Sequence, residues 1–177
     1  MEDIFLVGPK HSGKTSAGKA LAALCSGRFI DLDGLIAERT GESPRSLYTE
    51  GPAVFRNAEA AALAALIGSE TLDARIIAAG GGLIDNPDAI ALLENTKTAT
   101  PVYLDVSVDT AWERINGEAG GELPPFLKTE NPRETHRALH ERRAAAYRKF
   151  ARLTIEAERK SPEEIAGEIL ERLKHLN

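Results

Sequence analysis

The sequence contains a single cysteine and no long hydrophobic run. Cys25 therefore has no disulfide partner within the 177 residues, which suits a reducing compartment. No apolar segment approaches the roughly 20 residues that a membrane-spanning helix needs, and the first residues lack the basic and apolar regions of a secretory signal. We therefore expect a cytoplasmic protein with no membrane partner.

The sequence also lacks an excess of positive charge. Its formal net charge is −5, which argues against broad binding to nucleic acid or to anionic membranes. A site for a small anionic ligand needs only local positive charge, and this balance permits one. The hydrophobic content of 42% is ordinary for a globular protein. With no internal repeat, residues 1–177 are expected to form one domain and a monomer.

The clearest motif lies near the N-terminus. Residues 8–15, Gly-Pro-Lys-His-Ser-Gly-Lys-Thr, match G-x-x-x-x-G-K-[ST] at every fixed position. In this motif the backbone N–H groups cradle phosphate oxygens, the lysine reaches the β- and γ-phosphates, and the last hydroxyl binds Mg²⁺. The alternative is a glycine-rich turn between a strand and a helix. We predict a site for ATP and Mg²⁺ formed by Gly8, Ser12, Gly13, Lys14, Thr15 and Ser16.

The segments around this motif alternate between strand and helix patterns. An apolar run at 3–7 predicts a buried strand, and 16–24 a helix whose positive end faces the phosphates. Further strands are predicted at 28–32, 72–79, 100–106 and 151–156, and the helices between them include 52–67, 108–115 and 132–150. The final helix begins at Ser161 with a capping signature. This alternation predicts an α/β fold, a parallel sheet with helices on both faces.

Two acidic residues follow the second predicted strand. Asp31 and Asp33 alternate, so a strand period of two would place both side chains on one side. One could order Mg²⁺ through water while the other accepts a hydrogen bond from a substrate hydroxyl and helps remove its proton. The alternative is a turn with a helix cap, which Asp33 could supply. With Lys14, these two aspartates are the candidate catalytic residues.

Three glycines follow the third predicted strand. Gly80, Gly81 and Gly82 would allow a ligand to approach backbone N–H groups closely, and the alternative is a flexible turn. Ligands of parallel sheets bind beyond the carboxyl ends of the strands. Because the phosphate loop, the aspartates and the glycines all lie at such ends, their convergence predicts an enzyme site.

Two arginines are placed on helix faces. Arg56 borders an apolar stripe and lies three residues before Glu59, with which it could form a surface ion pair. Arg143 falls on the apolar face of the 132–150 helix, where it needs either an anionic ligand or an internal carboxylate as a partner. Arg142 is expected to point towards solvent.

Together these motifs resemble the shikimate kinase family. The matching residues are 8–15, 29–33, Gly51 with Phe55, Arg56 and Glu59, 79–82, 102–105, and Arg143 placed four before Tyr147. The resemblance implies a P-loop NTPase fold of the nucleoside-monophosphate-kinase type, with a five-stranded sheet of order 2-3-1-4-5. It also implies ATP-dependent phosphorylation of the 3-hydroxyl of shikimate, a small-molecule substrate.

The family resemblance also implies roles for individual residues. Asp33 would hold the shikimate hydroxyls and act as the base, while Asp31 would serve Mg²⁺. Arg56 and Arg143 would clamp the carboxylate, and Gly80 to Gly82 would lie against the ring. A helical segment at about 33–68 would bind the substrate, and the long segment at about 116–130, rich in glycine and proline, would form a lid.

The lid departs from the family pattern. Family members usually carry Arg-Pro-Leu-Leu there, with the arginine on the ATP phosphates, whereas this chain has Pro124-Pro125-Phe126-Leu127. Because proline cannot donate a hydrogen bond, Lys128 and Arg114 are the candidates to supply the missing charge. Two other functions are therefore considered: a related small-molecule kinase such as a gluconate kinase, and a catalytically weak protein that binds nucleotide or shikimate as a sensor.

Overall fold

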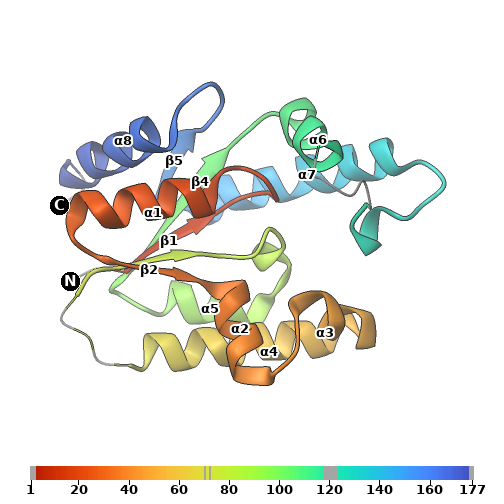
Figure 1. Ribbon diagram of the computed structural model, residues 1–177, viewed down its shortest axis with the longest axis horizontal. Coiled ribbons are helices and arrows are strands. Elements are labelled where there is room, and N and C mark those ends of the chain that lie inside the picture. Colours follow the sequence, from red (N-terminus) through yellow and green to blue (C-terminus); the bar gives the residue numbers. More distant parts are fainter. Residues whose placement is uncertain (1–2, 70, 72, 118–122, 176–177) are drawn as a thin grey trace.

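One parallel sheet organises the chain. The computed structural model describes residues 3–69, 71, 73–117 and 123–175. Five strands pair in the order β2-β3-β1-β4-β5, which confirms the predicted topology (Figure 1). Their bounds are β1 Asp3–Val7, β2 Arg28–Asp31, β3 Arg75–Ala78, β4 Ala99–Asp105 and β5 Leu153–Glu156. No helix in the described part of the chain has the length and apolar character that crossing a membrane requires.

Helices connect the strands in sequence. They are α1 Lys14–Cys25, α2 Leu32–Thr40, α3 Pro44–Glu50, α4 Pro52–Ile67, α5 Pro87–Glu94, α6 Val108–Asn116, α7 Pro132–Phe150 and α8 Pro162–Lys174, with 3₁₀ turns η1 Leu83–Asp85 and η2 Pro125–Leu127. The predicted capping box is present: the Ser161 side chain accepts from the Glu164 N–H, and the Glu164 side chain accepts from the Ser161 N–H.

Apolar side chains from alternate strand positions form two cores, one on each face of the sheet. Phe5 and Val7 of β1 belong to the core covered by α2, α3, α4, α5 and α7. Ile4 and Leu6 belong to the core covered by α1, α6 and α8. Successive side chains of a strand point to opposite faces, and burial of both faces explains the continuous apolar run. The result is the predicted three-layer arrangement (Figure 1).

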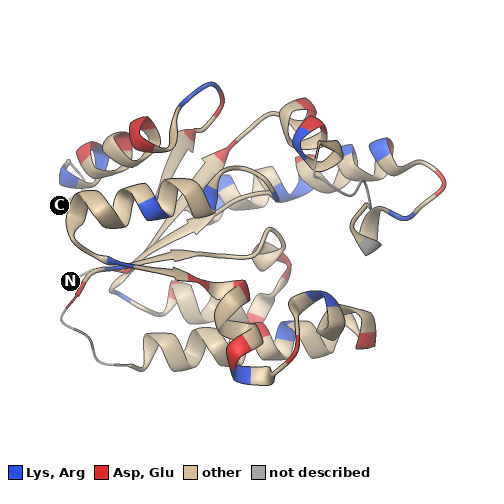
Figure 2. Cartoon of the chain, viewed as in Figure 1, with Lys and Arg blue, Asp and Glu red and all other residues tan. Residues whose placement is uncertain are grey.

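Every charged residue of the sheet stands at the first or last position of its strand. Asp3, Arg28 and Arg75 begin strands, while Asp31, Asp105 and Glu156 end them. Figure 2 shows the same separation, with the strands uncoloured along their length and charge gathered at their ends and on the helices. Burying an isolated charge is costly, so the strand interiors carry none.

Several element boundaries differ from the sequence-based prediction. The helix after the phosphate loop begins at Lys14 rather than at residue 16, because Gly13 already turns the backbone with φ +94°. The second strand ends at Asp31, whose side chain caps α2 by accepting from the Asp33 N–H at 3.1 Å. Asp33, which the alternative interpretation of this segment had as the cap, instead lies in the first turn of α2. The third strand is Arg75–Ala78, shorter than predicted at both ends, and residue 72 lies outside the described residues.

A buried ion pair joins β1, β3 and the end of α4. Arg75 Nε donates to Asp3 Oδ1 at 2.8 Å, and Arg75 Nη1 donates to Leu66 O at 2.6 Å and to Ser69 Oγ at 2.7 Å. The two residues are only 7% and 4% exposed. Removing one partner would leave the other charge buried without compensation.

Arg75→Leu is therefore expected to lower the free energy of unfolding by about 3–5 kcal/mol, measured by urea denaturation. Arg133→Leu is the matched control, because Arg133 pairs with Asp109 at 3.4 Å with both side chains more than half exposed. This control should cost at most about 1 kcal/mol. Equal losses for the two variants would contradict the structural role of the Arg75 pair.

Candidate active site

The phosphate loop is shaped by two glycines. Gly8 has φ +142°, and a Cβ at that position would lie 2.7 Å from Leu104 O. Gly13 has φ +94° and forms the N-cap of α1. Only glycine adopts such backbone conformations without strain, so these two positions let the loop wrap round the N-terminal end of α1. Ser12 is buried within the loop.

Lys14 lies inside this loop. Its Nζ donates to Gly8 O at 3.0 Å and to Pro9 O at 2.7 Å. Burial lowers the pKa of the Lys14 ammonium to about 8, although the charge of Asp33 opposes the change. The side chain nevertheless stays within reach of an anion entering the loop.

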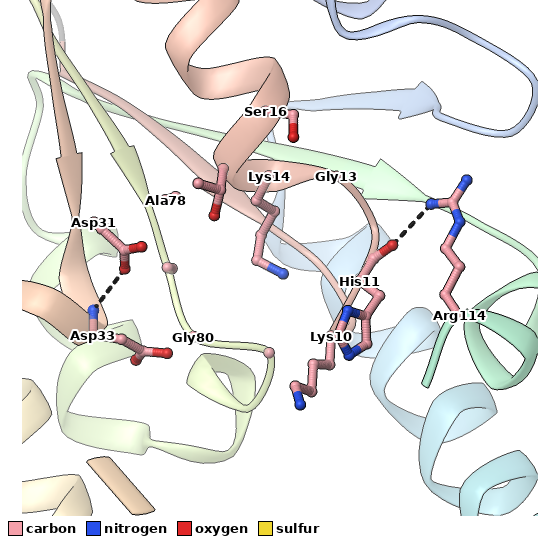
Figure 3. Close-up of a pocket in the computed structure, with 13 residues that line it drawn as sticks. Lys10, His11, Gly13, Lys14, Ser16, Asp31, Asp33, Ala78, Gly80 and Arg114 are labelled. Carbon is pink, nitrogen blue, oxygen red and sulfur yellow. Dashed lines mark hydrogen bonds between the residues drawn. The ribbon is translucent and has the colours of Figure 1, made fainter. Parts of the chain in front are cut away.

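The loop opens into a pocket of about 500 Å³. In Figure 3 the Lys14 and Asp33 side chains point into the same space from opposite sides. Nine of the sequence-predicted residues line it: Gly13, Lys14, Thr15, Ser16, Asp31, Asp33, Gly80, Gly81 and Arg114. The other two predicted loop residues, Gly8 and Ser12, belong to the loop but do not line the pocket. The structure thus brings the whole predicted nucleotide set together.

The two aspartates reach the pocket by a different route from the predicted one. Because the strand ends at Asp31, Asp33 comes from the first turn of α2 rather than from an alternating strand position. Burial raises the pKa of the Asp33 carboxyl, Asp31 adds to the rise, and Lys14 and Lys10 oppose it. Asp33 Oδ1 is buried and accepts no hydrogen bond from the described residues. An acid with a raised pKa and an unused oxygen is suited to receive a proton from a hydroxyl.

Of the two candidate cations, Arg114 is the one beside the phosphate loop. Its Nη1 donates to His11 O at 2.8 Å, a bond drawn in Figure 3. Lys128 is exposed, and it is not among the described residues that line the pocket. Residues 118–122 of the predicted lid lie outside the described residues.

A second pocket of about 340 Å³ adjoins the first. Its lining residues are Lys10, Asp33, Pro44, Arg45, Tyr48, Phe55, Gly80, Gly81, Gly82, Pro124, Phe126 and Arg143. Four of them, Lys10, Asp33, Gly80 and Gly81, also line the first pocket. The two cavities therefore meet at these four residues, which is where a group could pass from one to the other.

The partner of Arg143 is an internal carboxylate, one of the two alternatives left open by the sequence. Arg143 Nε donates to Asp85 Oδ2 at 2.8 Å, while the same arginine lines the second pocket. Arg142 is exposed as predicted but also holds Asp85, with Nη1 donating to Oδ1 at 2.8 Å. Arg56 is half-buried on α4 and does not belong to the described lining of either pocket.

Glu59 and Asn86 form a buried pair that the sequence did not assign. Asn86 Nδ2 donates to Glu59 Oε2 and to Arg56 O, both at 2.9 Å. Glu59 thus pairs with Asn86 rather than with Arg56, and burial raises its pKa to about 7. A Cβ on Gly80 would lie 3.2 Å from Asp33 Oδ1 and 3.3 Å from Glu59 Oε1, so both acids face this glycine. The sequence did hold one signal for this pair: Glu59 falls on the apolar face of the predicted 52–67 helix, where a carboxylate needs a partner.

These features define a class of protein. A phosphate loop at the carboxyl edge of a 2-3-1-4-5 sheet, opening onto an adjoining pocket with an acid and two arginines, is the arrangement of a P-loop kinase of small molecules. The family model for shikimate kinase matches residues 10–174. The chain therefore belongs to the shikimate kinase family.

Individual relatives agree with this placement. The chain is 34% identical to a shikimate kinase of Sulfurihydrogenibium sp. over 175 residues, covering 98% of this chain and 99% of the relative. It is similar to the structure of Acinetobacter baumannii shikimate kinase in complex with shikimate, with TM-score 0.87, 30% identity and coverage of 100% and 95% of the two chains. A gluconokinase from Sinorhizobium meliloti shares the fold, with TM-score 0.66, 21% identity and coverage of 99% and 93%.

Gly81 holds the two pockets together by a close backbone contact. A Cβ there would lie 2.8 Å from Lys10 N and 3.4 Å from Pro9 C, so an alanine would push the phosphate loop away. Gly81→Ala should therefore destabilise the protein by about 1–3 kcal/mol and weaken nucleotide binding, measured by urea denaturation and calorimetry.

Gly167→Ala is the matched control for this substitution. Gly167 lies within α8, and an added Cβ would meet no atom within 4 Å. The change should stabilise the protein by about 0.5–1 kcal/mol, because alanine favours a helix interior. Nucleotide affinity that is unchanged in Gly81→Ala would show that the contact with Lys10 does not shape the loop.

Proposed function

We propose that this protein transfers the terminal phosphoryl group of ATP to the 3-hydroxyl of shikimate. The observation that carries the proposal is the junction of the two pockets, where Asp33, Lys10 and two glycines line both cavities. A nucleotide on the phosphate loop and an acceptor in the second pocket would meet there. Membership of the shikimate kinase family identifies shikimate as the acceptor, and Arg143 in the second pocket suits its carboxylate.

The residues of the first pocket fit the nucleotide. Gly8, Ser12 and Gly13 shape the loop at the N-terminal end of α1, Lys14 adds a cation, and the helix end adds a positive dipole. Thr15 and Ser16 are exposed at the mouth of the loop, and Arg114 lies beside it. Together these groups bind and orient the phosphates of ATP.

The residues of the mouth also fit Mg²⁺. Thr15 and Asp31 are exposed oxygen donors in the same pocket, and Mg²⁺ in kinases is held by one or two protein oxygens together with substrate phosphates. Thr15 would ligate the ion and Asp31 would hold it through water. When bound, Mg²⁺ neutralises charge on the phosphates.

The second pocket orients the acceptor. Asp33 accepts the hydrogen bond of the reacting hydroxyl and takes its proton as the oxygen attacks, a role that its raised pKa favours. Arg143 binds the carboxylate, and Arg56 is proposed to join it from α4. Gly80, Gly81 and Gly82 present backbone without side chains to the ring. All these residues come from one chain, so a single copy would carry the complete site, and we propose that the protein acts as a monomer. The cytoplasmic location expected from the sequence is part of the same proposal.

A coupled assay of ADP release tests this function. Shikimate should raise ATP turnover far above the rate without an acceptor, and gluconate should not. Arg143→Lys should raise the shikimate KM by about 10-fold or more with little change in the ATP KM, because lysine cannot form the two-bond fork. Arg148→Lys is the matched control on the same helix, where Arg148 pairs with Asp105 at 2.7 Å. A rate that is independent of shikimate would refute the proposal.

The proline at position 124 of the lid leads to a second prediction, which concerns kcat. Pro124 lines the second pocket, yet it offers no positive charge to a transferring phosphoryl group, and an arginine in such a position can be worth about 10³–10⁵ in rate. Pro124→Arg should therefore raise kcat and leave the shikimate KM nearly unchanged. Residue 124 precedes Pro125, so its backbone already favours the extended conformation that an Arg-Pro pair adopts.

Leu123→Arg is the control for Pro124→Arg, because it adds the same charge one residue earlier in the lid. Its kcat should stay close to that of the unmodified protein. If kcat stays flat in Pro124→Arg and falls strongly in Lys128→Ala, Lys128 already provides the charge and the lid has no deficit. A large loss in Arg114→Ala would place that role beside the phosphate loop.

A further inference from the structure

Asp85 holds two neighbouring arginines of α7 with one carboxylate. It is the last residue of η1, the 3₁₀ turn that directly follows the three glycines, and its N–H donates to Gly82 O at 2.9 Å. Arg142 donates through Nη1 to Oδ1 at 2.8 Å and through Nη2 to Oδ2 at 3.0 Å. Arg143 donates through Nε to Oδ2 at 2.8 Å, and its Nη2 lies 2.7 Å from the same oxygen.

These bonds fix which edge of Arg143 remains for a ligand. A guanidinium has five N–H donors, and Asp85 occupies the side edge formed by Nε and Nη2. The end edge, formed by Nη1 and the second N–H of Nη2, remains for a second bidentate carboxylate. Asp85 therefore sets the plane of the guanidinium, and among the described residues no hydrogen-bond acceptor is paired with its end edge.

Two further contacts confine the same guanidinium. The Phe126 ring of η2 lies 5.7 Å from Arg143 Cζ, a distance at which a cation is attracted to a ring face. On another side, a Cβ on Gly82 would lie 3.2 Å from Arg143 Nη2. The Arg143 side chain is only 19% exposed. The guanidinium is thus bound by Asp85 along one edge, covered by the Phe126 ring and bordered by Gly82.

We propose that Asp85 is a positioning residue, which orients Arg143 so that its free edge receives the carboxylate of the acceptor. The inference rests on the proposed function, because it concerns the binding of shikimate in the second pocket. Asp85 does not line that pocket and acts only through Arg143.

The charge balance shows that Asp85 does not cancel the positive charge that attracts the acceptor carboxylate. The carboxylate of Asp85 neutralises one positive charge, but two arginines bind it, so Asp85, Arg142 and Arg143 together keep a net charge of +1. Burial acts to raise the pKa of Asp85, yet the hydrogen bonds from Arg142 and the charge of Arg143 outweigh it and hold that pKa below its usual value. Asp85 therefore stays ionised at neutral pH. Arg142, with its side chain 58% exposed, balances the carboxylate and leaves the charge of Arg143 available.

The anchorage of Asp85 makes it a rigid support. Asn86, the next residue, caps α5 and hydrogen-bonds Glu59 on α4. Ile84, the preceding residue, has its N–H within 3.4 Å of the Tyr147 hydroxyl on α7. The 3₁₀ turn is thus fixed on both sides of Asp85, and a fixed carboxylate gives Arg143 little freedom to turn away. A group held ready in this way binds its ligand at a lower entropic cost.

Asp85→Asn tests the proposal, because it removes the charge while keeping the shape. We expect the shikimate KM to rise about 10-fold, the size of one lost charge-assisted contact, with kcat and the ATP KM within about twofold. If Asp85 instead only weakens the positive field, the shikimate KM will fall. A fall, no change, or an equal loss for both substrates would overturn the proposal.

A double-mutant cycle separates positioning from a general structural effect. In an Arg143→Lys background, Asp85→Asn should change the shikimate KM by less than about twofold, because a lysine has no edge to orient. Additive losses in the double variant would overturn the proposal. Asp105→Asn is the matched control: Asp105 also holds an arginine of α7, Arg148, at 2.7 Å, and its loss should leave the shikimate KM unchanged.

Two checks keep the outcomes distinct. Circular dichroism and thermal melting establish that each variant is folded, and Asp85→Ser serves in the same cycle if Asp85→Asn does not fold. The unmodified protein is assayed alongside, because its lack of shikimate-dependent turnover would refute the proposed function itself. Turnover in the unmodified protein with an unchanged KM in Asp85→Asn would refute the positioning role alone.

Discussion

The two pockets meet because the backbone after β3 lies directly against the backbone of the phosphate loop. At Gly81 the space for a side chain is taken by the phosphate loop, because an added Cβ would lie only 2.8 Å from Lys10 N. This contact follows from the parallel pairing of β1 with β3, which brings the loops after both strands to the same edge of the sheet. Larger residues at this point would separate the nucleotide loop from the acceptor pocket.

The electrostatics of the site depend on the same junction. Lys14 and Asp33 face one cavity, and each acts on the ionisation of the other: the aspartate raises the pKa of the lysine and the lysine lowers that of the aspartate. Burial opposes both charges, which leaves the ammonium more acidic and the carboxyl more basic than in water. Although the protein has an overall negative charge, three cations, Lys10, Lys14 and Arg114, line the cavity that an anionic ligand would enter.

Local patterns in the sequence predicted most of the fold and most of the residues that line the first pocket. Strand alternation, capping residues and the phosphate-loop spacing act within a few residues, so they can be interpreted from the chain alone. Partners across elements could not be predicted in this way: Arg143 and Asp85 are 58 positions apart, and Glu59 and Asn86 are 27 apart. The apolar environment of Arg143 indicated that a partner was needed, but only the packing of η1 against α7 identified it.

The hydrogen bonds of Lys14 have a consequence for how ligands are distinguished. Its ammonium donates to the carbonyls of Gly8 and Pro9, so a ligand that takes either of these two N–H donors must offer a stronger acceptor than a carbonyl. A polyphosphate carries enough negative charge to make that exchange favourable, whereas a free nucleoside offers nothing in return. A nucleoside lacking phosphates would therefore compete poorly for this site.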